Sequence, residues 1–82
     1  MSTKTVFWAA LWHSENALNG VTEHLLYERC VPVLRQTRAE IRRYIRDYYG
    51  EISRRGDLRA EPHGWRVPRP VRVSISVVKE SV

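Results

Sequence analysis

The sequence predicts an α+β fold, a two-layer β-β-α-β arrangement in which a three-stranded, mostly antiparallel sheet carries one amphipathic helix. Three observations lead to this class: an apolar, aromatic-rich segment early in the chain, a capping box followed by a helical apolar stripe, and a late valine-rich segment with alternating polarity. With 82 residues, the chain is expected to form a single domain over residues 1–82.

The segment VFWAALWH, residues 6–13, is the first predicted strand. Alternate side chains of a strand point to opposite faces, so Trp8 and Trp12 lie on one face and Phe7 and Leu11 on the other. Both faces are therefore apolar. Because one helix covers one face of a sheet, the sequence predicts an uncovered apolar patch that meets a partner. The two candidate patches are Trp8, Trp12 and Tyr27, or Phe7, Leu11 and Leu26.

Asn19-Gly20 predicts a tight hairpin, because both residues tolerate the positive φ of a type I′ turn. The returning strand is expected over residues 21–31, where Pro32 interrupts it. A hairpin closed on this turn pairs Leu18 with Val21, Trp12 with Tyr27 and Trp8 with Val31.

Thr37-Arg-Ala-Glu40 is a capping box and predicts a helix that begins at Arg38. The helix is expected to end near Arg55, with Gly56 as its C-terminal cap. Its apolar stripe consists of Ile41, Tyr44, Ile45, Tyr48 and Ile52.

Residues 57–70 contain three prolines and a glycine and are expected to form an ordered connection. Residues 71–77 alternate between apolar and mostly polar side chains, which predicts the last strand. Pro68 and Pro70 suit the entry to a strand or an edge strand.

The formal net charge is +5, and most of it lies in the second half of the chain. The helix face opposite its apolar stripe is rich in arginine. This pattern is typical of a surface that binds phosphate groups or an acidic protein, although a solvated face with ion pairs such as Glu51–Arg55 has the same composition. The candidate binding residues are Arg42, Arg43, Arg46 and Arg54, with Arg38 and Tyr49 at the margin of the face.

Trp8, Trp12 and Tyr27 are the aromatic interface candidates. They are expected to be core under the helix or part of a homodimer interface. A platform for stacking nucleic-acid bases is less favoured, because such platforms have glycine and basic residues between the rings, and VFWAALWH has neither.

The sequence contains no paired carboxylates, phosphate loop or close metal-ligand spacing, so we expect no enzyme activity, no metal and no cofactor. The longest apolar run, residues 6–12, is too short to span a membrane. A single cysteine, Cys30, excludes an intrachain disulfide and is expected to be a small half-buried core residue. These features predict a cytoplasmic protein.

The segments PVLRQTRAEIRRYI and DLRAEPHGWRVPRPVRV resemble small uncharacterised accessory proteins of tailed bacteriophages, in which a hairpin leads into a TR-x-E helix and a PHGW segment into a last valine-rich strand. The resemblance covers about two thirds of the chain, residues 25–77, and implies a non-enzymatic protein in the host cytoplasm. It implies docking on a host protein or nucleoprotein assembly, in a host-takeover or anti-defence role. Direct nucleic-acid binding and self-association as a structural component are the alternatives.

Overall fold

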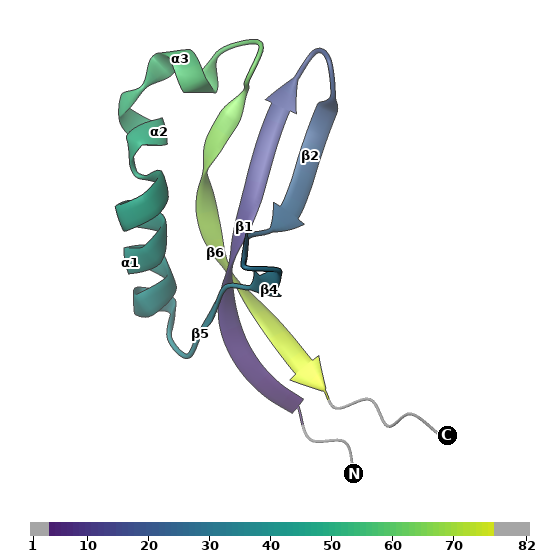
Figure 1. Ribbon diagram of the computed structural model, residues 1–82, viewed down its shortest axis with the longest axis vertical. Helices are drawn as coiled ribbons and strands as arrows, with labels where there is room; N and C mark the ends of the chain where they lie inside the picture. The colour runs from purple at the N-terminus through teal and green to yellow at the C-terminus, as the bar shows by residue number, and fades with distance from the viewer. Residues whose placement is uncertain (1–3, 77–82) are drawn as a thin grey trace, which may run out of the picture.

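The computed structural model describes residues 4–76 of the chain and confirms the α+β class. Figure 1 shows the long strands side by side and the helices together beside them. The strands are β1 (Lys4–Asn16), β2 (Gly20–Leu25), β3 (Tyr27–Glu28), β4 (Val31–Pro32), β5 (Leu34–Arg35) and β6 (Trp65–Ser76). The helices are α1 (Arg38–Tyr49), α2 (Glu51–Arg54) and α3 (Gly56–Arg59).

Strand β1 is the centre of a four-stranded sheet, one strand more than the sequence predicted. It pairs with β6 along one edge and with β2 and the short β5 in succession along the other, always antiparallel. Strands β3 and β4 form a separate two-stranded ribbon. The predicted second strand, residues 21–31, is therefore divided, because the chain leaves the sheet after Leu25.

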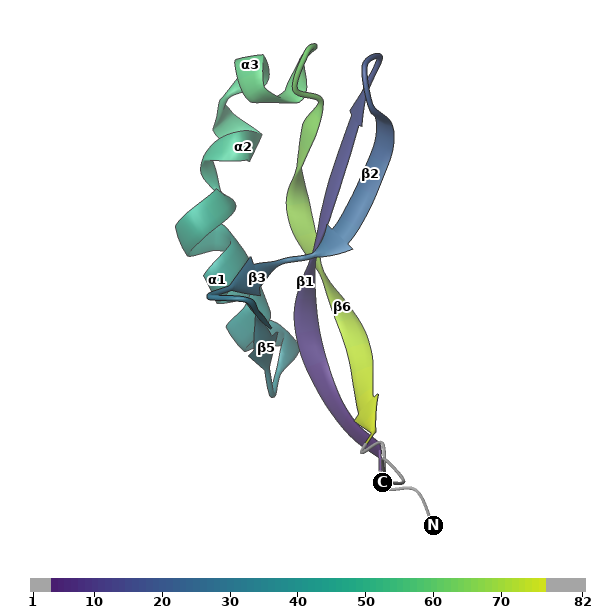
Figure 2. The ribbon, with the colours of Figure 1, turned by 45° about the vertical axis from the view of Figure 1, so that its right-hand side comes forward.

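The helices lie on one side of the sheet in both views (Figures 1 and 2). Helix α1 packs on the face that carries Trp8, Ala10 and Trp12 of β1, and Ala10 and Ile41 are completely buried there. The buried cluster is Ala10, Leu26, Val33, Ile41 and Ile45, with Trp8, Trp12, Tyr44 and Tyr49 packed against it. Of the two apolar faces of β1, the helices cover the tryptophan face.

The predicted hairpin register is wrong by three positions. Strand β1 pairs Leu11 with Leu25 and Trp12 with His24, and the turn is longer than two residues. In this turn Gly20 alone has a positive φ, of 70°, and the Asn16 Oδ1 atom accepts a hydrogen bond from the Asn19 backbone N–H at 2.7 Å. An odd shift exchanges the faces of the returning strand, so Leu25 shares the face of Leu11, whereas Leu26 is buried under the helix.

The tight turn of two positive-φ residues is at Arg29 and Cys30, between β3 and β4. Their φ values are 52° and 66°, which matches the type I′ geometry that the sequence predicted for Asn19-Gly20. Cys30 is exposed at this turn rather than half-buried in the core.

The Thr37 cap is confirmed, because its Oγ1 atom accepts a hydrogen bond from the Glu40 backbone N–H at 3.2 Å. The predicted end of the helix near Arg55 is wrong, since α1 ends at Tyr49 and α2 and α3 follow. The Gly50 carbonyl accepts from the Ser53 hydroxyl at 2.7 Å and from the Ser53 backbone N–H at 3.2 Å, which replaces the helical i to i+4 ladder. Gly56 begins α3 instead of capping α1.

Strand β6 begins at Trp65, so much of the predicted connection over residues 57–70 is strand or helix. Pro68 and Pro70 fit in β6 because its outer edge has no strand partner within residues 4–76. The register between β1 and β6 shifts between Leu11 and His13, which marks a bulge. The predicted alternation of the last strand holds through Ser76, and Val77 lies outside the described residues.

Candidate anion-binding face

Helix α1 carries four exposed arginines, Arg38, Arg42, Arg43 and Arg46. Helical spacing places Arg43 and Arg46 away from the core-facing Ile41 and Ile45, and Arg42 on the flank next to β6. Arg54 is also exposed, but it belongs to α2 because the helix breaks at Gly50. Tyr49 lies half-buried beside Trp12 and is therefore not a surface residue of this face.

Within residues 4–76, no arginine of α1 forms an ion pair. The only ion pair on the helical segments of this range joins Arg55 to Asp57, at 2.7 Å, instead of the predicted pair with Glu51. Hydrogen bonding to Arg55 lowers the pKa of Asp57, and the same bond raises the pKa of Arg55. Within the described part of the chain, the donors of the α1 guanidinium groups are therefore not occupied by a carboxylate.

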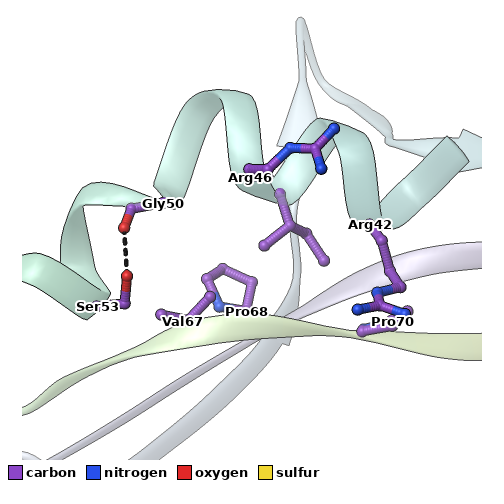
Figure 3. Close-up of a pocket in the computed structure, with 8 residues that line it drawn as sticks. Arg42, Arg46, Gly50, Ser53, Val67, Pro68 and Pro70 are labelled. Carbon is purple, nitrogen blue, oxygen red and sulfur yellow. Dashed lines mark hydrogen bonds between the residues drawn. The ribbon is translucent and has the colours of Figure 1, made fainter. Parts of the chain in front are cut away.

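Arg42 and Arg46 border two adjoining hollows. One, of about 270 Å³, lies between α1 and β6, and Figure 3 shows Arg42 reaching toward Pro70 while Arg46 points away from β6. The other, of about 400 Å³, is lined by Ala39, Arg42, Arg43 and Arg46. None of the described residues that line either hollow is acidic. The two hollows form a continuous surface whose charged donors suit phosphate or carboxylate oxygens.

Arg43 also borders a hollow of about 250 Å³ on the side of Tyr44 and Tyr48. Glu40 and Asp47 line this hollow, so the acidic residues of α1 gather on one side of the arginine face. The two tyrosine rings lie 4.9 Å apart, and Tyr48 is 70% exposed. Burial raises the pKa of Tyr44. The Arg35 guanidinium lies over the Tyr44 ring, with its Cζ atom 5.4 Å from the ring centroid.

Of the two roles expected for the tryptophan candidates, the structure supports core, because Trp8 and Trp12 are half-buried against the cluster under α1. The Trp12 ring lies 5.6 Å from Trp65 and 6.2 Å from Tyr49, both edge-on, and stacks with His24 at 6.3 Å. Trp8 also packs against the buried cluster. Tyr27 is 59% exposed but lies on β3, outside the main sheet. Sequence reasoning missed Trp65 because its segment was expected to be a connection.

A second charged group lies on the sheet face away from the helices. The two ring nitrogens of His13 lie 3.0 Å from carboxylate oxygens of Glu23 and Glu15, and Arg69 reaches Glu23 at 3.5 Å. The hydrogen bond to Glu23 is the main cause that raises the pKa of His13, and the bond to Glu15 adds to it. The same His13 contact lowers the pKa of Glu23.

Comparison with known proteins identifies no relative: no family model, no curated protein and no solved structure matches the chain. Among the described residues, no group of three or more His, Cys, Asp or Glu side chains is arranged to hold a metal ion. None of the helices formed by residues 4–76 has the length and apolar character needed to cross a bilayer.

Proposed function

We propose that this chain is a non-enzymatic binding protein that docks on the phosphate backbone of nucleic acid through the arginine face of α1. The proposal is carried by the exposed guanidinium groups of α1, which have no acidic partner within residues 4–76. These groups border two adjoining hollows, and no described residue that lines the hollows is acidic. Neutralising phosphates with such groups releases counterions, which supplies affinity independent of sequence. A formal net charge of +5 and a pI near 10.0 support association with a polyanion.

Burial of the tryptophans favours nucleic acid over an acidic protein surface. Protein interfaces draw most of their binding energy from fully desolvated aromatic and arginine anchors. Trp8 and Trp12 pack against the core, so neither tryptophan is available as an anchor beside the arginine face. Phosphate binding has no such requirement, because charge alone supplies most of the affinity.

The test is a titration of labelled duplex DNA, single-stranded DNA and RNA at about 50 and 200 mM salt. If the protein contacts several phosphates, the affinity is expected to fall by orders of magnitude over this range. Absence of binding at low salt would eliminate direct nucleic-acid binding.

Matched variants assign the binding to α1. Arg42→Gln and Arg46→Gln each remove one charge that has no acidic partner within residues 4–76, so each is expected to weaken binding. Each is also expected to reduce the slope of log affinity against log salt concentration by roughly 0.9 for every phosphate that the variant no longer neutralises. Arg55→Gln removes the same formal charge from a residue that is already paired with Asp57, and it serves as the control. Equal losses of affinity in all three variants would point to net charge and not to the α1 face.

Docking on an acidic surface of a host protein or nucleoprotein assembly is the second candidate. Exposed Tyr48, beside Arg43, favours it, because tyrosine and arginine are common anchors of protein interfaces. If no nucleic acid binds, capture from a host lysate with wild type and with Tyr48→Ala tests this alternative. A partner retained equally by both proteins would argue against it. The phage-type accessory role and the host cytoplasm as its location stay predictions based on the resemblance.

A further inference from the structure

The sheet has a second apolar face, on the side away from the helices. Cross-strand partners share a face, and β1 pairs Phe7 with Val73, Ala9 with Leu34 and Val71, and Leu11 with Leu25. Ala9 is buried between its larger neighbours, whereas the large apolar residues of this face are half-buried and Ile75 is 43% exposed. None of them belongs to the buried cluster under α1. We name this surface the open sheet face, and its large apolar residues are Phe7, Leu11, Leu25, Leu34, Val71, Val73 and Ile75.

The open sheet face has the dimensions of the core of a dimer interface. Its apolar block spans three strands at roughly 4.8 Å spacing and about eight residues of β1 at about 3.4 Å each, an outline on the order of 400 Å² in which most side chains are half-buried. The largest apolar patch on a typical monomer is about 300–600 Å² and is often functional. A standard interface buries about 800 Å² on each partner, with an apolar centre and a polar rim. Here the polar rim consists of His13, Glu23 and Arg69.

Charge selects a second copy of the same chain as the occupant. On the open sheet face, Glu23 is paired with His13 and Arg69, and Glu15 with His13, so opposite charges are already matched. Helix α1, whose arginines form no ion pair within residues 4–76, lies in the other layer of the molecule (Figure 2). Two copies with a formal charge of +5 each can therefore approach through this face without bringing their basic helices together.

We propose that two copies of this chain stack their open sheet faces to form a homodimer with the layer order helix, sheet, sheet, helix. Stacked sheets pack about 10 Å apart, which allows Phe7, Leu11 and Val73 of the two copies to interdigitate. The arginine face of α1 then lies on both outer sides of the dimer. This dimer differs from the one expected from Trp8, Trp12 and Tyr27, because the helices cover the tryptophan face.

The test is the mass of the full chain in solution, measured by sedimentation equilibrium from about 1 to 200 μM. The wild type is expected to sediment at twice its mass of 9.7 kDa in the upper part of this range. Ile75→Lys adds a charge at the edge of the proposed interface, where the wild-type side chain is already 43% exposed, so the fold is expected to survive. This variant is expected to weaken dimerisation at least tenfold, and Val73→Lys, nearer the centre, to abolish it.

Val6→Lys is the matched control. Val6 lies at the same end of β1, is 48% exposed and points to the opposite face, so it receives the same charge outside the proposed interface. Its dimerisation constant is expected to equal that of the wild type. A monomeric wild type at 200 μM would overturn the proposal. So would a dimer that Ile75→Lys and Val73→Lys leave intact while circular dichroism shows both folded, or equal weakening by Val6→Lys. None of these outcomes depends on binding to nucleic acid.

Discussion

Gly64→Ala is predicted to be among the most destabilising single-methyl additions in this protein. Gly64 joins α3 to β6 with a positive φ of 63°, and its carbonyl accepts the Glu15 backbone N–H at 2.9 Å. A Cβ atom at this position would lie 1.6 Å from the backbone oxygen of Glu15, at which distance no side chain fits. The added methyl group must therefore push the end of β6 away from β1.

The cost has two parts. An alanine with positive φ costs roughly 1–2 kcal/mol. Displacing the strand end breaks the hydrogen bond to Glu15, worth about 1 kcal/mol, and disturbs the close packing around it. The reduced entropy of the unfolded chain returns about 0.4–1 kcal/mol. These terms give an expected net loss of stability of about 1–3 kcal/mol, a large share of the roughly 5–15 kcal/mol that stabilise a typical domain.

Gly20→Ala is the matched control, because Gly20 has a similar φ of 70° and open space around its hypothetical Cβ atom. It is expected to lose about 1 kcal/mol from backbone strain alone. Urea unfolding, followed by tryptophan fluorescence, measures the free energy of unfolding of both variants. In thermal unfolding, the midpoint of Gly64→Ala should lie roughly 5–15 °C below that of Gly20→Ala. Equal losses of stability would refute the argument from the close approach of Gly64 to Glu15.

Four further predictions each concern a single residue. Glu23→Gln is expected to lower the pKa of His13 toward its ordinary value of 6.5, as followed by NMR of the imidazole ring, and an unchanged pKa would contradict the hydrogen-bond assignment. Folding raises the pKa of His13, so its stabilisation is fully present below pH 6.5 and is lost as the pH rises through the raised pKa. His13→Gln should therefore flatten the pH dependence of the unfolding free energy over that interval. Thr37→Ala is expected to lower the free energy of unfolding by about 1 kcal/mol, as measured in urea. Thr37→Ser keeps a hydroxyl and should lose much less stability, and equal losses in the two variants would argue against the cap. Cys30→Gly is expected to stabilise the protein by about 1 kcal/mol, since glycine relieves the φ of 66°, and a lower thermal midpoint would contradict it.

Short sequence motifs predicted an element correctly where the motif residues have only one possible set of hydrogen-bond partners. The Thr37 hydroxyl caps α1 because it can reach the Glu40 backbone N–H, and Arg38 begins the helix as expected. The same signals failed where two uses competed. Asn19-Gly20 suits a type I′ turn, but the Asn16 side chain and the Glu61 carboxylate bind the backbone N–H groups of Asn19 and Ala17, which favours a longer turn.

The candidate anion-binding face could be predicted because an amphipathic helix places its residues by spacing alone. Arg38, Arg42, Arg43 and Arg46 are exposed because Ile41 and Ile45 face the core. The absence of ion pairs in this group within residues 4–76 could not be predicted, since it depends on where Glu51 and Asp57 lie after the break at Gly50.

Three features follow from the order of the residues alone: β1 has two apolar faces, one amphipathic helix begins at Arg38, and the outer side of that helix is basic. Periodicity and capping are properties of neighbouring residues, so they can be recognised before the chain folds. Only the tertiary structure decided that α1 covers Trp8 and Trp12 and leaves Phe7 and Leu11 on the open sheet face. The physical reason is register: a shift of three positions in the hairpin brings Leu26 under the helix, and the long turn that sets this shift is held by Glu61, more than forty residues away.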